Sequence, residues 1–262
     1  MNDPIVEFVD VTPGMAREWL GLNESNRKQK TGAISANARD MRAGNWVMTG
    51  EAIKFDTDGK LVDGQHRLEA LIRADTTARM MIVHGVAPEA RMYMDTGVRR
   101  SAADMLHMTG AHASFAAAAG VRLGLLVESG RSFTPTHHEI AKFVEDHPDF
   151  PAMAEKAMTY LHVPLLPSVK VYTVWQLHQV DEEAASKFFY SLNTMTGMLE
   201  GDARLSLIRK LPNIEKPRST RGKLHMVALV IAAWNAWRNR QPLERIPVRY
   251  SDDGKLRIAE PI

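Results

Sequence analysis

Short apolar runs dominate the first third of the chain and predict β-strands. Between them, apolar residues recur at helical spacing. One helix is expected after Thr12, with Pro13 at its first position, and a second over Ile34–Ala43, which ends at Gly44. The Asp56–Gly59 segment has the composition of a hairpin turn. The predicted strands are Ile5–Val11, Ala52–Phe55, Lys60–Val62 and Met80–Val86.

After Pro88 the strand pattern nearly vanishes, and helical patterns follow one another up to about residue 240. The longest of them is the final one, Thr220–Arg238. Its apolar stripe is expected to pack in a core, and it comprises Met226, Leu229, Val230, Trp234 and Trp237. Capping residues indicate further helix starts at Ser101, Thr136, Ser168 and Asp181. The tail is expected to be irregular, with one hairpin at residues 252–254.

The chain is therefore predicted to be α+β, with a small mixed α/β module over residues 1–100 and a mainly α-helical region over residues 101–262. With 45% hydrophobic and 24% charged residues, it has enough apolar material for a substantial core. No run approaches the length of a membrane span, and the first residues lack a secretory signal, so a cytoplasmic protein without membrane association is expected. The absence of cysteine excludes disulfides, thiolate metal sites and a cysteine nucleophile.

Charge is distributed unevenly along the chain. Residues 132–202 contain 4 basic and 10 acidic residues, whereas residues 203–262 contain 13 basic and 5 acidic residues. A basic tail of this kind can follow a nucleic-acid backbone, which makes Arg218, Arg221 and Lys223 candidate nucleic-acid contacts. Two alternatives are a solvated face and internal pairing with the acidic middle of the chain.

The segment that carries most chemistry is Asp63-Gly64-Gln65-His66-Arg67. It joins a predicted strand to a helix in which Leu68, Leu71 and Ile72 recur at helical spacing. Backbone N–H groups and the helix dipole favour an anion beyond such a helix start. The segment is therefore predicted to bind phosphate.

This five-residue motif, followed by the strand at residues 80–86, resembles the ParB/sulfiredoxin superfamily and its DGQHR-type relatives over roughly residues 5–100. The resemblance implies a turn that holds nucleotide phosphates. It also implies activities that include nucleoside triphosphate hydrolysis, phosphoryl transfer and, in some branches, DNA cleavage. Gln65 stands where sulfiredoxins have their catalytic cysteine, so that chemistry is excluded. The second ParB motif is replaced by Ala87–Arg91, which favours a stand-alone or phage-type member.

The residues of the motif can be given chemical roles. Arg67 can bind two phosphate oxygens, and His66 can donate or accept a proton, although a structural hydrogen bond would also explain His66. Lys54, together with Gly64 and Gln65, is expected to contact phosphate, unless Lys54 points to water. Glu51 and Asp63 could hold Mg²⁺ or act as general base, and Asp63 could instead cap the helix. Glu51 and Lys54 are both expected on the strand before the hairpin.

A second predicted anion site is Asp95–Ser101, in which Arg99 or Arg100 would contact phosphate and Asp95 or Thr96 the sugar or a metal. The alternative is an ordinary capped turn. Two functions are consistent with these sites. One is an enzyme that uses ATP or CTP with Mg²⁺ for phosphoryl transfer or hydrolysis and acts with DNA, and the other is a nucleotide-responsive DNA-binding regulator. A ParB-like nuclease and a homodimeric state also remain open.

Overall fold

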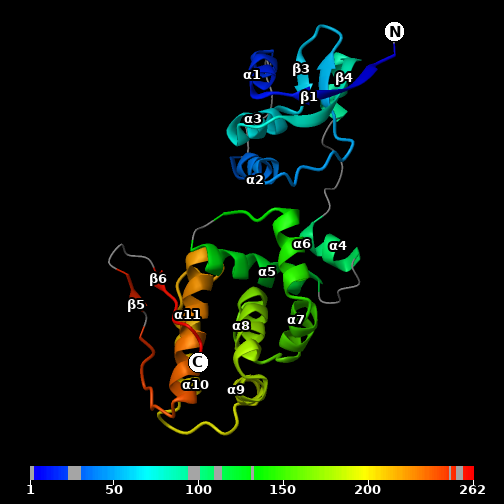
Figure 1. The fold of residues 1–262 in the computed structure, drawn as a ribbon. Helices are drawn as coiled ribbons and strands as arrows, with labels where there is room; N and C mark the ends of the chain where they lie inside the picture. Colours follow the sequence, from blue (N-terminus) through cyan, green and yellow to red (C-terminus); the bar gives the residue numbers. More distant parts are fainter. Residues whose placement is uncertain are drawn as a thin grey trace. The chain divides into compact units, whose positions relative to one another are not determined.

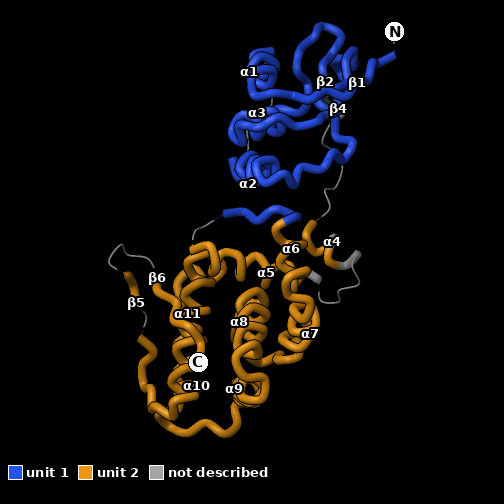
Figure 2. The backbone as a smooth tube through the Cα atoms, in the orientation of Figure 1, with its two compact units in different colours: residues 1–99, 133–138 blue, residues 100–132, 139–262 orange. Residues whose placement is uncertain are grey.

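The computed structural model describes residues 3–22, 31–93, 101–108, 114–130, 133–247, 249–251 and 256–262. The chain divides into two compact units (Figure 2). The first comprises residues 1–99 and 133–138, and the second comprises residues 100–132 and 139–262. The main division lies next to the boundary expected from the sequence. The return of residues 133–138 to the first unit was not expected.

The first unit is built on a four-stranded mixed sheet with the strand order β1-β4-β2-β3 (Figure 1). Strand β1 runs antiparallel to β4, β2 runs parallel to β4, and β3 closes an antiparallel hairpin with β2. The strands are β1 (Ile5–Val11), β2 (Ile53–Asp56), β3 (Leu61–Asp63) and β4 (Ala78–Val86). The helical segments are α1 (Pro13–Gly21), α2 (Thr31–Arg42), α3 (Gln65–Ala74) and the 3₁₀ helix η1 (Pro88–Tyr93).

The core of this unit lies between the helices and one face of the sheet. Val11 of β1 is buried there with Met80 and Ile82 of β4, against Leu68 and Leu71 of α3. Alternation is clear only at the start of β4, where Ala78, Met80 and Ile82 are buried and Arg79 is exposed. Strand β1 does not alternate, because its residues from Ile5 to Phe8 are all exposed.

The predicted hairpin turn after β2 is also confirmed. Asp56 Oδ1 accepts hydrogen bonds from the backbone N–H groups of Asp58 at 3.0 Å and Lys60 at 2.8 Å. Gly59 has φ +75°, a conformation that glycine adopts without strain. Asp56 thus uses its side chain to fold the turn, which explains why it is buried although it is charged.

Residues 133–136 pack against α2, although nearly a hundred residues separate them in sequence. Arg39 Nη2 donates to the Thr134 carbonyl at 2.7 Å, and the Arg39 guanidinium lies over the Phe133 ring. Thr136 Oγ1 donates to Asp40 Oδ1 at 3.0 Å. These contacts explain why this segment belongs to the first unit.

The second unit is mainly helical, with α8 at the centre of its core (Figure 1). Residues on every side of α8 are buried, and α5, α7, α9 and α11 contact it. Its helices are α4 (Ala102–Met108), α5 (Ser114–Ser129), α6 (His137–Asp146, whose first two residues are assigned to the first unit), α7 (Phe150–Thr159), α8 (Pro167–Val180), α9 (Glu182–Thr194), α10 (Ala203–Lys210), η2 (Leu211–Asn213) and α11 (Thr220–Arg238). The strands β5 (Arg249–Tyr250) and β6 (Leu256–Arg257) pair with each other.

Capping residues mark several helix starts as predicted. Ser101 and Asp104 exchange capping hydrogen bonds before α4, and Asp181 caps α9. The prediction at Ser168 is wrong, because α8 begins at Pro167 after the N-cap residue Leu166. Ser219, which was not predicted as a cap, caps α11. The stripe of α11 is buried as expected except at Trp237, which is only half-buried. The expected tail hairpin corresponds to the β5–β6 pair, and its turn lies outside the described residues.

The α+β fold class with a helical C-terminal region is confirmed. Among the described residues, no helix combines the length and the apolar character needed to cross a bilayer.

Candidate functional site

The predicted phosphate turn depends on Gly64, the N-cap residue of α3, which has φ 105° and ψ 0°. This backbone conformation is strained for any residue with a Cβ. A Cβ at this position would also collide with Ile53 Cδ1 and lie 3.1 Å from Ile53 Cα on β2. Glycine therefore allows the turn to lie directly against β2, and this close approach sets the position of the start of α3.

Replacing Gly64 with alanine is expected to destabilise the first unit by about 2–4 kcal/mol, because left-handed strain and overpacking against Ile53 act together. Gly59→Ala is the matched control: Gly59 also has a positive φ but has no atom near its virtual Cβ, so only about 1–2 kcal/mol of strain is expected. Native-state hydrogen exchange of the α3 amides measures the loss of stability in each of the two variants. Equal losses in the two variants would contradict the role of the Ile53 contact.

Lys54, Asp63 and Arg67 form a charged cluster at this turn. Lys54 and Asp63 are cross-strand partners in the β2–β3 hairpin, and Lys54 Nζ donates to Asp63 Oδ2 at 2.9 Å. Arg67, one helical turn after Asp63, lies with Nη2 3.4 Å from Asp63 Oδ1. The Lys54, Asp63 and Arg67 side chains are 28%, 19% and 14% exposed. The cluster is thus partly buried and carries a formal net charge of +1.

The cluster keeps Asp63 ionised. Burial alone would raise the pKa of the Asp63 carboxyl, but the hydrogen bond from Lys54 and the positive charges of Arg67 and Lys54 outweigh burial and hold this pKa below its ordinary value. A carboxylate with a lowered pKa is a weak base at neutral pH. The position of Asp63 therefore favours a structural role, in which it orients Lys54 and Arg67.

Replacing Asp63 with asparagine is expected to lower the free energy of unfolding of the first unit by about 1–3 kcal/mol at pH 7. Two partly buried cations, Lys54 and Arg67, would lose the anion that they share. Since the folded pKa of Asp63 is lowered, the carboxylate stabilises the unit above its unfolded pKa and loses this effect as pH falls through the folded pKa. The difference in the free energy of unfolding between wild type and Asp63→Asn should therefore be constant from pH 7 to about 5 and become smaller below about pH 4. Hydrogen exchange of α3 at several pH values tests this, and a gap that widens on acidification would contradict it.

Arg67 has a nitrogen that nothing in the described chain satisfies. Its Nη1 atom is buried and has no hydrogen-bond partner among the described residues. A buried guanidinium nitrogen without an acceptor is rare and costly in a folded protein, and such atoms often mark the place of a bound ion or ligand. This atom lies on the residue predicted from the sequence to bind phosphate.

The other residues of the motif occupy different environments. Gln65 is buried, and His66 is half-buried in the first turn of α3. Two expectations are corrected. Glu51 is exposed and precedes β2 by two residues, so it is not on the strand that carries Lys54, because pairing with β4 begins only at Ile53. Asp63 is not the helix cap, since Gly64 occupies that position and no side chain caps α3.

The second predicted anion site, with Thr96, Arg99 and Arg100, lies outside the described residues. Its role stays a prediction. Ser101, at the end of that segment, caps α4 together with Asp104.

The turn offers few ligands for Mg²⁺. Across the described ranges, no group of three or more His, Asp or Glu side chains is placed to hold a metal ion. Both oxygens of Asp63 already face cations, and Glu51 is outside the cluster. This donor set does not fit a metal ion held by the protein alone. It leaves Mg²⁺ as a prediction in which the ion arrives bound to the phosphates of a nucleotide.

The basic tail separates into two groups. Arg204, Arg209 and Arg238 pair with Asp202, Glu200 and Asp181 of the acidic middle at 2.6–3.0 Å, as one of the alternatives expected. Arg218, Arg221 and Lys223, the predicted nucleic-acid contacts, have no ion-pair partner within the described residues. They lie just before α11 and in its first turn.

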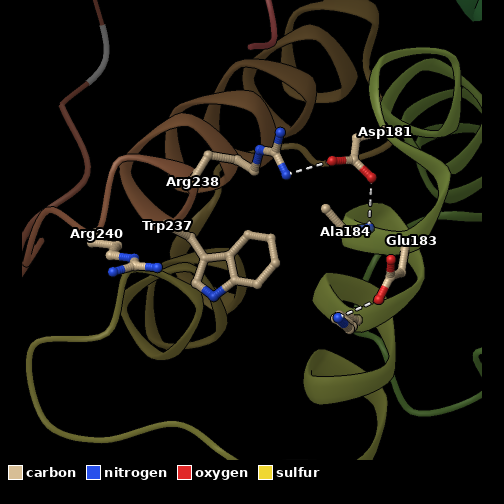
Figure 3. Close-up of a pocket in the computed structure, with 7 residues that line it drawn as sticks. Asp181, Glu183, Ala184, Trp237, Arg238 and Arg240 are labelled. Atoms are coloured by element: carbon tan, nitrogen blue, oxygen red, sulfur yellow. Dashed lines mark hydrogen bonds and ion pairs between the residues drawn. The ribbon is translucent and has the colours of Figure 1, made fainter.

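A pocket of about 460 Å³ in the second unit was not predicted from the sequence. It lies between the start of α9 and the end of α11, where Asp181, Glu183 and Ala184 face Trp237, Arg238 and Arg240 (Figure 3). Its charges are largely paired internally, Asp181 with Arg238 and Glu183 with Lys187. Trp237 was predicted to be part of the core stripe; it does pack against the core, beside Phe188 and Trp234, but it is only half-buried and also lines this pocket.

Comparisons of the chain with models of protein families, with curated proteins and with solved structures give no match. The function must therefore be inferred from the geometry of the chain itself.

Proposed function

We propose that the Asp63–Arg67 turn binds the phosphate of a nucleoside triphosphate or of a nucleic acid and promotes phosphoryl transfer or hydrolysis. The observation that carries this proposal is the buried Nη1 of Arg67, which has no hydrogen-bond partner within the described ranges. A phosphate oxygen is the acceptor that such a guanidinium nitrogen binds best, with a charge-assisted hydrogen bond.

Three further features support an anion at this position. Lys54 and Arg67 carry two positive charges, and Asp63 carries one negative charge. The cluster therefore has a net positive charge that an anion can neutralise. Gly64 is the N-cap of α3, and the dipole of this helix favours negative charge at this end. The resemblance to the ParB/sulfiredoxin superfamily suggests the same ligand class.

His66 is the residue proposed for proton transfer. The lowered pKa of Asp63 weakens its carboxylate as a general base, and Glu51 lies outside the strand that carries Lys54. His66 lies in the first turn of α3, directly before Arg67, and an imidazole has one nitrogen that can donate a proton and one that can accept it. It can therefore donate a proton to a leaving oxygen or accept one from an attacking hydroxyl.

A nucleotide-responsive DNA-binding regulator is the second candidate. It is favoured by the engagement of Asp63 with two cations, which builds a binding site more readily than a catalytic one. In this function the nucleotide would shift a conformational equilibrium, and turnover would be slow or absent.

Binding and turnover assays with ATP and CTP, in the presence of Mg²⁺ and DNA, test the proposal. Saturable binding with release of phosphate, or with transfer of phosphate to DNA, is expected for the enzyme. Saturable binding without product would favour the regulator, and cleavage of DNA would favour a ParB-like nuclease. Absence of binding to every nucleotide and to DNA would refute the phosphate site.

A further inference from the structure

Five cations lie around the start of α11, and the described part of the chain offers none of them an ion-pair partner. In this they differ from Arg204, Arg209 and Arg238 of the same unit. The only carboxylate among them in sequence is the exposed Glu215. We call this set the basic surface; it comprises Lys210, Lys216, Arg218, Arg221 and Lys223.

The chain is built to hold these cations together. The loop before α11 folds back so closely that a Cβ on Gly222 would lie 2.9 Å from both Pro217 Cα and the Pro217 carbonyl oxygen. Ser219 fixes the same loop, because its N–H and Oγ both donate to the Lys216 carbonyl, at 2.9 and 2.7 Å. Its Oγ also caps α11 by accepting from Gly222 N at 3.0 Å. Lys216 and Arg218 are thereby brought next to the first turn of α11.

Lys210, on α10, belongs to the same surface. Its positive charge and that of Arg221 both act on His225, one helical turn further along α11. The Nε2 atom of His225 is buried and has no hydrogen-bond partner in the described part of the chain. Like charges therefore converge here with no anion to balance them.

We propose that the basic surface binds the phosphodiester backbone of a nucleic acid. Lys216, Arg218 and Arg221 are exposed and can contact phosphates directly. The dipole of the 19-residue helix α11 adds a favourable field at its N-terminus. This inference concerns the second unit alone and does not depend on the Asp63–Arg67 site.

The surface fits a nucleic acid better than a protein partner. Protein interfaces usually have an apolar centre, but no large hydrophobic side chain is exposed between residues 203 and 247, all of which the structure describes. Interfaces with nucleic acids are polar and strongly positive. The contacts available here address phosphate rather than base edges, so binding with little sequence preference is expected.

Fluorescence anisotropy of full-length protein with a labelled 20-base-pair duplex tests the proposal. The triple variant Lys216→Gln, Arg218→Gln, Arg221→Gln is expected to bind at least tenfold more weakly near physiological salt. It should also have a salt dependence that is shallower by about 2–3 in log–log slope. Arg209→Gln is the matched control, because Arg209 lies on the adjacent α10 but is paired with Glu200; its affinity should change less than about twofold.

Wild-type affinity in the triple variant, or equal losses in the triple variant and Arg209→Gln, would overturn the assignment. So would equally tight binding of poly-glutamate, which would indicate an acidic protein partner. An NMR titration of His225 supplies an independent readout. Burial, followed by the charges of Lys210 and Arg221, lowers the pKa of His225, so a bound phosphate backbone should raise that pKa, and an unchanged value at saturating DNA would count against this site.

Discussion

Replacing Arg67 with methionine is expected to weaken nucleotide binding by about 100-fold. Arg67 supplies the only buried guanidinium nitrogen in the described residues that lacks an acceptor, and a charge-assisted hydrogen bond to phosphate is typically worth about 1.5–3 kcal/mol. Methionine retains the apolar stem of the side chain and fills a similar space. Isothermal titration with ATP and CTP measures the effect.

Arg79→Met is the matched control for this change. Arg79 lies on β4 of the same unit, pairs with Asp10 at 2.9 Å, and is 57% exposed. Its replacement removes the same charge and should leave nucleotide affinity within about twofold, since an exposed ion pair contributes little. If Arg67→Met binds nucleotide as tightly as Arg79→Met does, the guanidinium of Arg67 does not hold the phosphate.

Replacing His66 with alanine is expected to lower turnover by about 100- to 10,000-fold, the usual contribution of a general acid or base. Nucleotide affinity should change by less than about tenfold, because Arg67 and Lys54 carry most of the proposed binding energy. Initial rates of phosphate release, measured together with dissociation constants, separate the two effects.

Two outcomes of the His66→Ala measurement would contradict a role of His66 in proton transfer. Unchanged turnover would mean that His66 makes only a structural hydrogen bond, the alternative expected from the sequence. Loss of binding equal to the loss of turnover would place His66 among the phosphate ligands. Hydrogen exchange of α3 provides the control that the helix remains folded.

Much of the fold could be predicted because its signals are local. The hairpin turn follows from Asp56 and Gly59, and the α4 start follows from Ser101 and Asp104, since each residue acts on a backbone group a few positions away. The long helix α11 was predicted with its observed bounds from its persistent apolar pattern, and the structure adds that Ser219 caps it. Periodicity and capping are enough for such elements.

Other features depend on contacts that are distant in sequence. Nothing near Thr136 indicates that its hydroxyl donates to Asp40, 96 residues earlier. Which arginines of the tail form ion pairs likewise depends on where the fold places the carboxylates of the acidic segment, residues 132–202. Arg209 and Arg221 look alike in the sequence, but of the two only Arg209 pairs with a carboxylate of the described residues.

The candidate site shows the same limits. The motif Asp63–Arg67 and its strand-to-helix turn were predicted from the sequence, whereas the engagement of Asp63 by both Lys54 and Arg67 required the β2–β3 register. This engagement changes the interpretation of Asp63 from general base to a residue that orients cations. The β2–β4 register likewise leaves Glu51 outside the strand and the cluster.

The most direct test of the phosphate site is a crystal structure of the protein soaked with ATP or CTP. We expect a phosphate oxygen within hydrogen-bond distance of Arg67 Nη1, beside Lys54 and the first turn of α3. An ordered nucleotide bound elsewhere, with Arg67 Nη1 still lacking an acceptor, would contradict the account.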